Sequence, residues 1–381
     1  MLAILSVAIL VTLLTSAVLV ALFGGTRLKG TDALPLTAFM AILFTSGLDV
    51  GLIMFPLTEF PTYETEAPYG FTNALAIEFG FWGGLVWAFY FLTTFYFCVI
   101  EPRLKLFEIS WVKAINNAVI IATCAFTGFL FLSYLPTYIV GIPEAARYGL
   151  VAAVVLLAVL SSTDIRYVKW LSIGSSALFF GLILLLLAIL PNGPVELPGT
   201  LANLSGYFEN LPKFVLPLTD YHAFYLFWWF AWSIMIGQFV ARFVGGLSAR
   251  QLLVALLIIP SIPIALWFSV LFMYHETGRE LASILRTCMV AVGVIFVINS
   301  LDSLTRLYSE NLGLTVRRFG GLIYVALHWA LLFGLILLYQ FTPLKIEWIG
   351  LVVIGLYACI YTLVIARRGE TWAALRNQTD G

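Results

Sequence analysis

The sequence predicts an all-α membrane protein with about eleven transmembrane helices. Of its 381 residues, 62% are hydrophobic and only 10% are charged, whereas a soluble domain has roughly 25% charged residues. The mean hydropathy is +1.01, so there is too little polar surface to cover a globule in water. The apolar runs are continuous rather than alternating, as expected for helices, whose backbone hydrogen bonds are all internal.

The spans follow from the length of the apolar runs. A helix needs ~20 apolar residues to cross ~30 Å of hydrocarbon. This rule places the spans at 2–23, 33–57, 80–100, 114–136, 148–162, 169–190, 222–244, 251–273, 282–303, 319–340 and 345–366. The first span has no basic leader and no small-residue cleavage site, so it is expected to be retained.

Basic residues are distributed unevenly between the two sets of loops. Of the 20 lysines and arginines, fifteen fall on the side of the C-terminus, Arg286 falls within a span, and four fall on the other side, at Arg147, Lys213, Arg279 and Lys345. Because basic loops stay in the cytoplasm, we expect a cell-membrane protein with its N-terminus outside and its C-terminus inside. The net charge of +0 indicates no nucleic-acid partner. The four cysteines lack metal or disulfide spacing.

After the first span, the predicted helices form two groups of five. The expected organisation is a peripheral helix with an inside loop (1–32), a first five-helix repeat (33–190), an external amphipathic connector (191–221), a second repeat (222–367) and a short cytoplasmic tail (368–381). Because five is odd, the two repeats insert in opposite senses.

The helix that opens each repeat contains residues that favour an interruption. Gly47, Gly51 and Pro56 lie in the first of these helices, and Gly237 lies in the second. In transporters built from inverted repeats, interrupted helices bind substrates and ions through freed backbone groups. The alternative is that the glycines only allow two helices to pack closely.

Asp49 lies near the middle of the span 33–57. A carboxylate at this depth costs at least ~2.5–3.5 kcal/mol on insertion scales, so such residues usually have a function. Three roles are open: counter-charge for a cationic substrate, ligand of an inorganic cation, or proton carrier. The structural alternative is an ion pair with Arg286, the other charge well inside a span.

Aromatic side chains form two groups near mid-membrane depth. Trp82, Trp87 and Tyr90 are expected on one broad face of a single helix, because successive residues are ~100° apart. The second group lies within one arc of its helix and consists of Trp228, Trp229 and Trp232. Clustered aromatic faces bind quaternary ammonium ions. The alternative is an interfacial belt, the usual place of tryptophan in membrane helices.

These motifs resemble the betaine/choline/carnitine transporter family over nearly the whole chain. The segment FWWFAWS at 227–233 resembles its tryptophan-rich signature helix, and FWGGLVWAFY at 81–90 has the spacing of the other half of its aromatic box. FTSGLDVGL at 44–52 resembles the unwound glycine-rich segment, and SLDS at 300–303 resembles the S-A-D-S motif that ends the eighth core helix.

The resemblance implies a LeuT-type core of five plus five helices, preceded by one peripheral helix where the family normally has two. The implied substrate box consists of Trp82, Trp87, Tyr90, Trp229 and Trp232, with Trp228 on the access route. The implied sodium site consists of backbone oxygens of Thr45, Leu48 and Phe296 with the side chains of Asn299 and Ser300. Gly47 and Gly51 belong to the unwound helix. Family members are commonly trimeric, so a homotrimer is expected.

Two residues depart from the family pattern. Asn299 stands where Thr is common, and its amide oxygen can still bind sodium. Asp49 replaces the middle glycine of the unwound segment. In the family, an aspartate at the last glycine, here Gly51, accompanies choline. A carboxylate close to the box favours a net cation over a zwitterion, whose own carboxylate it repels.

The sequence therefore predicts a secondary active transporter, not an enzyme, that imports a choline-like onium compound by alternating access. No cofactor is expected beyond a coupling ion, Na⁺ or H⁺. One alternative is a sodium-coupled importer of a zwitterion such as glycine betaine or carnitine. A more distant alternative is a transporter-derived membrane sensor, which the short tail disfavours because it leaves no room for an output domain. Catalysis is disfavoured because the three histidines are scattered and no carboxylate pair stands out.

Overall fold

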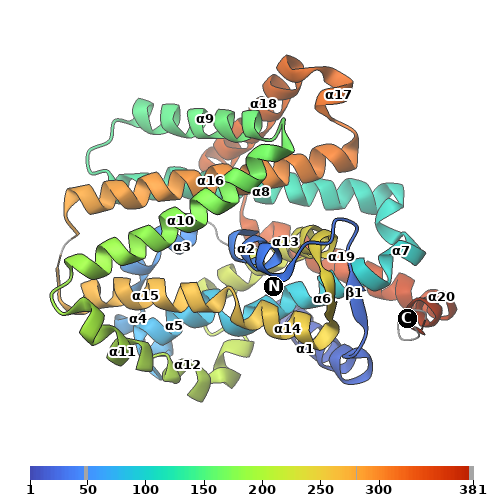
Figure 1. Cartoon of the computed structure of the whole chain (residues 1–381), viewed down its shortest axis with the longest axis horizontal. Helices are drawn as coiled ribbons and strands as arrows, with labels where there is room; N and C mark the ends of the chain where they lie inside the picture. The colour runs from blue at the N-terminus through green and yellow to red at the C-terminus, as the bar shows by residue number, and fades with distance from the viewer. Residues whose placement is uncertain (47–49, 280, 377–381) are drawn as a thin grey trace.

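The structure, a computed structural model, describes residues 1–46, 50–279 and 281–376, with the backbone alone at 41, 42, 44–46, 165, 168 and 169. The chain is almost entirely helical (Figure 1). The predictions that concern Gly47, Leu48 and Asp49 lie outside the described residues.

The helices of the described chain are α1 (Leu2–Phe23), α2 (Leu36–Ser46), α3 (Val50–Met54), α4 (Pro56–Thr65), α5 (Ala74–Trp82), α6 (Ala88–Val99), α7 (Glu101–Leu104), α8 (Ser110–Tyr138), α9 (Glu144–Ser161), α10 (Ile165–Ile189), α11 (Gly193–Ala202), α12 (Ser205–Glu209), α13 (Asp220–Phe243), α14 (Ala249–Ile258), α15 (Ser261–Glu276), α16 (Ser283–Leu312), α17 (Val316–Phe319), α18 (Gly321–Phe341), α19 (Ile346–Ala366) and α20 (Arg368–Arg376). Short 3₁₀ helices occupy Ala67–Tyr69, Gly84–Trp87, Leu106–Glu108 and Leu211–Val215. Strand β1 (Arg27–Lys29) pairs antiparallel with β2 (Gly245–Ser248).

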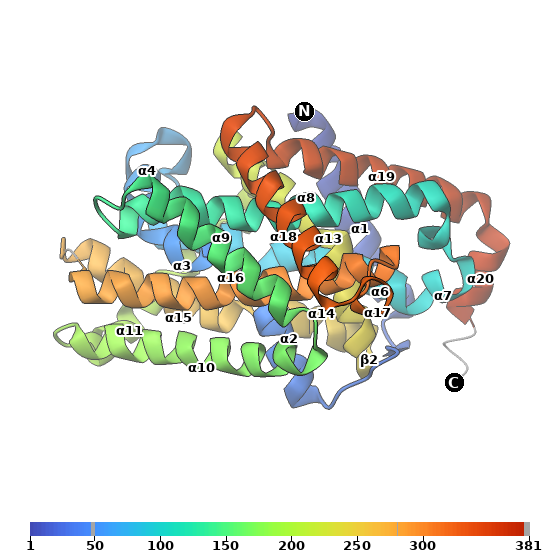
Figure 2. The ribbon, with the colours of Figure 1, turned by 90° about the horizontal axis from the view of Figure 1, so that it is seen from above.

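Ten helical segments of the described chain are long and apolar enough to cross a membrane. They correspond to ten of the eleven predicted spans, and the remaining one, 33–57, is divided among α2, α3 and α4. Most of the long helices run along the long axis of the molecule (Figures 1 and 2). Helices α4 and α11 lie at one end of this axis, and α7 and α20 lie at the other.

The first core helix is interrupted at Pro56, and neighbouring helices satisfy its backbone. Proline has no N–H, so the Leu52 carbonyl loses its helical partner. The indole N–H of Trp267 on α15 donates to this carbonyl at 2.8 Å. The Tyr138 hydroxyl on α8 donates to the carbonyl of Met54 at 2.7 Å. Side chains of two other helices therefore hold the interruption in place.

The second helix of each repeat is also broken, which the sequence did not indicate. Helix α5 ends at Trp82, and Gly84 has φ +62°, a conformation that favours glycine. In the second repeat, Pro260 separates α14 from α15. The two breaks touch, because the Gly84 N–H donates to the Ser261 hydroxyl oxygen at 2.8 Å. The predicted span 80–100 is found at Ala74–Val99, but it is not one continuous α-helix, since a 3₁₀ turn stands between α5 and α6.

Helix α13 is continuous, so the interruption predicted near Gly237 is wrong. A side chain at Gly237 would overlap Thr93 on α6. The Thr93 hydroxyl donates to the Ser233 carbonyl at 2.8 Å. Gly237 therefore serves close helix packing, which is how small residues act between membrane helices.

Replacing Trp267 with Phe tests the support of the interrupted helix. The substitution leaves the buried Leu52 carbonyl without a donor, so we expect the free energy of unfolding to fall by about 1–3 kcal/mol. Trp170→Phe is the control, because Trp170 is 73% exposed. Unfolding in mild detergent measures both variants, and equal stability of the two would contradict this account.

Candidate functional site

Five aromatic side chains from α5, the following 3₁₀ turn, α6 and α13 form one cluster, here called the tryptophan box. Its members are Trp82, Trp87, Tyr90, Trp228 and Trp229. The ring centroid of Trp229 lies 5.9 Å from that of Trp82, 6.0 Å from Trp87 and 5.6 Å from Tyr90. Trp228 packs edge-on against Trp82 at 5.3 Å. All five side chains are buried.

Trp232, the sixth aromatic residue of the prediction, is not part of this cluster. It is buried on α13, but within the described part of the chain no ring contact joins it to the other five. Trp228, expected on the access route, occupies a place in the box instead. The structure thus brings together five of the six predicted aromatic residues.

The break after α5 orients two of the indoles. The last carbonyls of a helix have no helical partner. The Trp229 N–H donates to the Phe81 carbonyl at 2.7 Å, and the Trp87 N–H donates to the Trp82 carbonyl at 3.0 Å. The helix break, rather than one shared helical face, therefore produces the cluster.

Three other indole N–H groups have no hydrogen-bond acceptor in the described chain. They belong to Trp82, Trp228 and Trp232. Buried polar groups are nearly always hydrogen-bonded, so each of these donors needs an explanation. Two of them lie in the box, where an oxygen atom of a bound molecule or a water would satisfy them.

Helix α3 covers the box. A Cβ atom at Gly51 would lie 2.6 Å from the Trp82 ring and 3.0 Å from the Trp228 ring. Phe55, at the end of α3, contacts both rings at centroid distances of 6.0 and 6.1 Å and stacks on Tyr134 at 4.2 Å. Gly51, which the prediction placed in the unwound part of the helix, is instead helical within α3 and lies directly against the predicted substrate site.

Two buried glutamates, Glu59 and Glu78, lie on the helices that flank the break between α4 and α5. Both fall between the predicted spans 33–57 and 80–100, so they were expected in a loop. The Tyr63 hydroxyl donates to Glu78 Oε2 at 2.6 Å, and the Tyr134 hydroxyl donates to Glu59 Oε1 at 3.3 Å. Glu59 lies beyond the predicted span, and burial raises the pKa of its carboxyl. Glu78 was overlooked because the span was started at residue 80, whereas α5 begins at Ala74.

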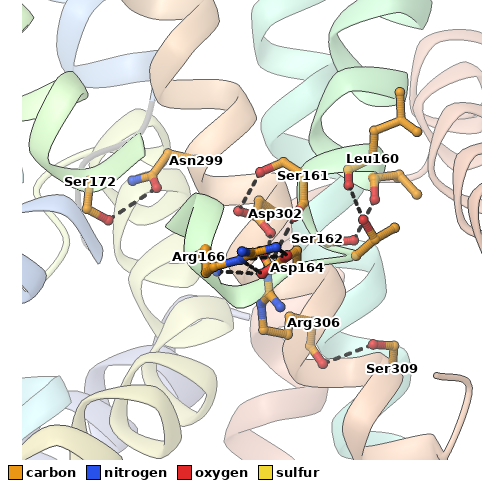
Figure 3. A network of polar contacts seen from close by, with 12 residues as sticks. Leu160, Ser161, Ser162, Asp164, Arg166, Ser172, Asn299, Asp302, Arg306 and Ser309 are labelled. Atoms are coloured by element: carbon orange, nitrogen blue, oxygen red, sulfur yellow. Dashed lines mark hydrogen bonds and ion pairs between the residues drawn. The ribbon is translucent and has the colours of Figure 1, made fainter. Parts of the chain in front are cut away.

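The predicted sodium site is only partly described. Asn299 and Ser300 lie buried on α16, and Asn299 Oδ1 accepts a hydrogen bond from Ser172 on α10 at 3.4 Å (Figure 3). Phe296 is buried one turn earlier on the same helix. Thr45 lies in α2, which packs against α16. Its side chain and all of Leu48 are outside the described residues, so this site stays a prediction.

A polar network joins α16 to the end of α9 (Figure 3). Asp302 is fully buried, accepts a hydrogen bond from Ser161 at 2.9 Å and pairs with Arg306 at 3.1 Å. Arg306 also donates to the Asp164 carbonyl at 3.2 Å. In the loop, the Arg166 guanidinium lowers the pKa of the Asp164 carboxyl to about 2. Arg306 and the Ser161 hydroxyl thus compensate the charge of the buried Asp302 carboxylate.

Comparison with known proteins explains why these elements occur together. Residues 106–275 match the profile of the betaine/carnitine/choline family of transporters. The chain is 26% identical over 279 residues to the glycine betaine transporter OpuD of Bacillus subtilis, covering 62% of this chain and 54% of that protein. It is 29% identical over 293 residues to the high-affinity choline transport protein of Escherichia coli K12, covering 65% and 43%. Over residues 106–275 the chain is thus similar to the betaine/carnitine/choline transporter family.

Other comparisons agree with this family. An uncharacterized transporter of Mycobacterium tuberculosis H37Rv is 26% identical over 297 residues, covering 65% of this chain and 50% of that protein. The chain spans about half the length of the curated relatives it matches. The matching family and these relatives are transporters, which agrees with the expectation drawn from the sequence.

A solved structure identifies the fold. The substrate-bound, outward-open state of a Na⁺-coupled sialic acid symporter matches with a TM-score of 0.50 at 14% identity, covering 93% of this chain and 85% of that one. This match and the family confirm the predicted LeuT-type fold of a multi-pass membrane protein.

Gly51→Ala tests the fit of α3 on the tryptophan box. The added methyl group meets two indoles that cannot both move freely, so we expect a loss of about 1–3 kcal/mol in the free energy of unfolding. Near-ultraviolet circular dichroism, which reports coupled indoles, should change as well. Gly293→Ala is the matched control, because its Cβ would meet only Val50 and Met54 at 3.7 and 3.9 Å. An unchanged spectrum of the Gly51 variant would contradict the contact.

Proposed function

We propose that the protein is a secondary active transporter that imports a quaternary-ammonium or related onium compound by alternating access, with a choline-like cation preferred. The tryptophan box carries the proposal. A quaternary ammonium ion cannot donate hydrogen bonds, so the negative faces of aromatic rings are its main partners. Two relatives, a glycine betaine transporter and a choline transport protein, are consistent with this substrate class.

The geometry of the box suits one onium group. A cation within ~6 Å of several ring centroids gains about 0.5–2 kcal/mol from each ring. Edge-to-face packing of aromatic rings places their centroids ~4.5–7 Å apart and leaves ring faces free for other partners. Trp82 and Trp229 are 5.9 Å apart with an interplanar angle of 83°. Trp229 contacts three of the other rings and is therefore the central member.

The position of the box suits alternating access. Trp82, Trp87 and Tyr90 come from the first predicted repeat, whereas Trp228 and Trp229 come from the second. A substrate held here contacts both halves, so a relative movement of the halves changes the side from which it is reached. Helix α3, which lies on Trp82 and Trp228, is part of the first half and would move with it.

Asp49 is the proposed counter-charge or proton carrier of this site. It precedes Gly51, which touches the box, by two residues. A carboxylate at this place would favour a net cation over a zwitterion. The coupling ion is proposed to be H⁺ or Na⁺, the latter bound near Asn299 and Ser300 in the site described above.

A second candidate is sodium-coupled import of a zwitterion such as glycine betaine or carnitine. The unpaired indole N–H groups of Trp82 and Trp228 favour it, because a substrate carboxylate would accept from them. For either substrate, the charge asymmetry of the loops supports a cell-membrane protein with its N-terminus outside and its C-terminus inside. A homotrimer is proposed on the family resemblance.

Titration calorimetry of the purified protein with choline and with glycine betaine, each with and without sodium, tests the substrate. Saturable choline binding without sodium is expected. Trp229→Ala should weaken it about 2- to 30-fold, since one ring contact of about 0.5–2 kcal/mol is lost. Trp170→Ala, at an exposed position, is the control and should bind normally.

The same titrations separate the two candidates. Binding of glycine betaine only in the presence of sodium would favour the zwitterion importer. Asp49→Asn should reduce the preference for choline over betaine, and an unchanged preference would show that Asp49 is not the counter-charge. Absence of binding by both compounds would refute the proposed substrate class.

A further inference from the structure

Glu78 is a fully buried carboxylate on the same face of α5 as Trp82, a member of the tryptophan box. Its exposed fraction is 0%. It lies four residues before Trp82 on α5, so the two side chains are neighbours on that helix. The Trp82 indole interacts with the Glu78 carboxyl, although neither Glu78 Oε1 nor this N–H makes a short hydrogen bond in the described chain. The carboxyl group therefore lies beside a wall of the proposed onium site with neutral donors only.

No described cation compensates Glu78. The ion pairs of the described residues all lie elsewhere, and the polar groups that interact with Glu78 are neutral: the Tyr63 hydroxyl at 2.6 Å and the Trp82 indole. Titratable groups on the elements around it include Glu59 and Tyr63 on α4, Tyr69 before α5, Tyr134 on α8, Tyr207 on α12, Tyr221, His222 and Tyr225 on α13, and Tyr274 and His275 on α15. The cation of α13, Arg242, pairs with Asp32 and Glu310.

The histidines do not supply the missing charge. His222 Nδ1 accepts a hydrogen bond from the Leu218 N–H at 3.1 Å, so this ring is neutral with its proton on Nε2. His275 is paired with Glu64 at 2.9 Å. The tyrosines are uncharged at neutral pH. Glu59 is a second acid, and a like charge nearby makes an ionised Glu78 still less stable.

These surroundings make the charge of Glu78 depend on a ligand. An isolated buried carboxylate is so costly that it takes up a proton instead. A cation that enters the box supplies the positive charge that the protein lacks around Glu78. Binding of the cation therefore stabilises the ionised form, and by linkage deprotonation strengthens binding of the cation.

We propose that Glu78 is a proton-exchanging counter-charge of the tryptophan box, protonated when the box is empty and ionised when an onium cation occupies it. The inference rests on the proposed function, because it needs a cationic ligand in the box. In the exchange, the carboxylic O–H bond of Glu78 breaks, its electron pair stays on the carboxylate, and the proton goes to water. The site holds either a proton or a cation.

The neighbouring groups suit the departure of this proton. The Tyr63 hydroxyl is hydrogen-bonded to Glu78. Tyr63 lies four residues after Glu59 on α4, so the two side chains share one face of that helix. Glu59 is 9% exposed and lies at the end of the molecule that carries α4. Proton release is therefore expected toward this end, which the charge distribution assigns to the outside.

Proton release on choline binding tests the proposal. The purified full chain is titrated with choline in weakly buffered solution that contains a pH indicator dye, while calorimetry reports binding. At pH values at which Glu78 is protonated in the empty box, about one proton should be released per bound choline. In the same pH range the affinity for choline should rise up to tenfold per pH unit. Glu78→Gln should bind choline with no proton release and no such pH dependence. Glu66→Gln, an exposed glutamate at the same end, should behave as wild type.

The outcomes distinguish the two proposals. Absence of choline binding by the wild type would refute the proposed function, and the inference with it. Choline binding without proton release would refute only the inference. Release that survives in Glu78→Gln but disappears in Asp49→Asn would assign the exchange to Asp49 and overturn it. If the Glu78 variant does not fold, difference infrared spectra of the wild type decide: choline should remove the carbonyl band of a protonated carboxylic acid, and an unchanged band overturns the proposal.

Discussion

Helix α5 ends at Trp82 because the chain becomes extended at Gly83 and turns through a positive φ at Gly84, and the arrangement of the tryptophan box depends on this ending. The carbonyls of the last turn would be costly to bury unpaired. The indoles of Trp229 and Trp87 satisfy two of them, which fixes both rings. One backbone break thus converts an unsatisfied helix end into the frame of an aromatic site.

Close approach of backbones explains why the box can be assembled from four elements. In a membrane, helices gain little from hydrophobic burial against one another, so packing depends on small residues that let backbones meet. Gly51 lets α3 lie on two indoles, and Gly237 lets α13 lie on α6. Gly350 does the same on α19, where a side chain would overlap the Phe227 backbone beside the signature tryptophans. Small residues at these three places allow the large residues between them to be buried.

Much of the fold was predictable because it depends on long, local patterns. Ten of the eleven spans are found as helical segments, since ~20 apolar residues have few other ways to satisfy their backbone in lipid. The break at Gly83 was not predictable from hydropathy, because apolar residues continue on both sides of it. The prediction that Trp82, Trp87 and Tyr90 lie on one continuous helix is therefore wrong. The three rings are nevertheless close together, because each of them contacts Trp229.

The candidate site was only partly predictable, for a related reason. The aromatic residues stand out by type and spacing, whereas Trp232 satisfies the same spacing and still has no ring contact with the cluster in the described chain. Glu78 was missed because one acid at the edge of an apolar run resembles a loop residue. Its burial depends on Tyr63, Tyr225 and other groups that are distant in the sequence. Contacts between distant segments decide which residues of a motif form a site.

Two fully buried carboxylates, Asp302 and Glu78, show how charge is used in the membrane. Asp302 is fully buried, but Arg306 one turn away and the Ser161 hydroxyl compensate it, so it can stay ionised and hold α9 against α16 (Figure 3). Glu78 is as deeply buried, yet it has only neutral donors, Tyr63 and Trp82, and no cation in the described chain. A charge with its own partner stabilises one arrangement of helices. A charge without one gains a partner only when a ligand arrives, which makes binding of that ligand and loss of the proton a single coupled event.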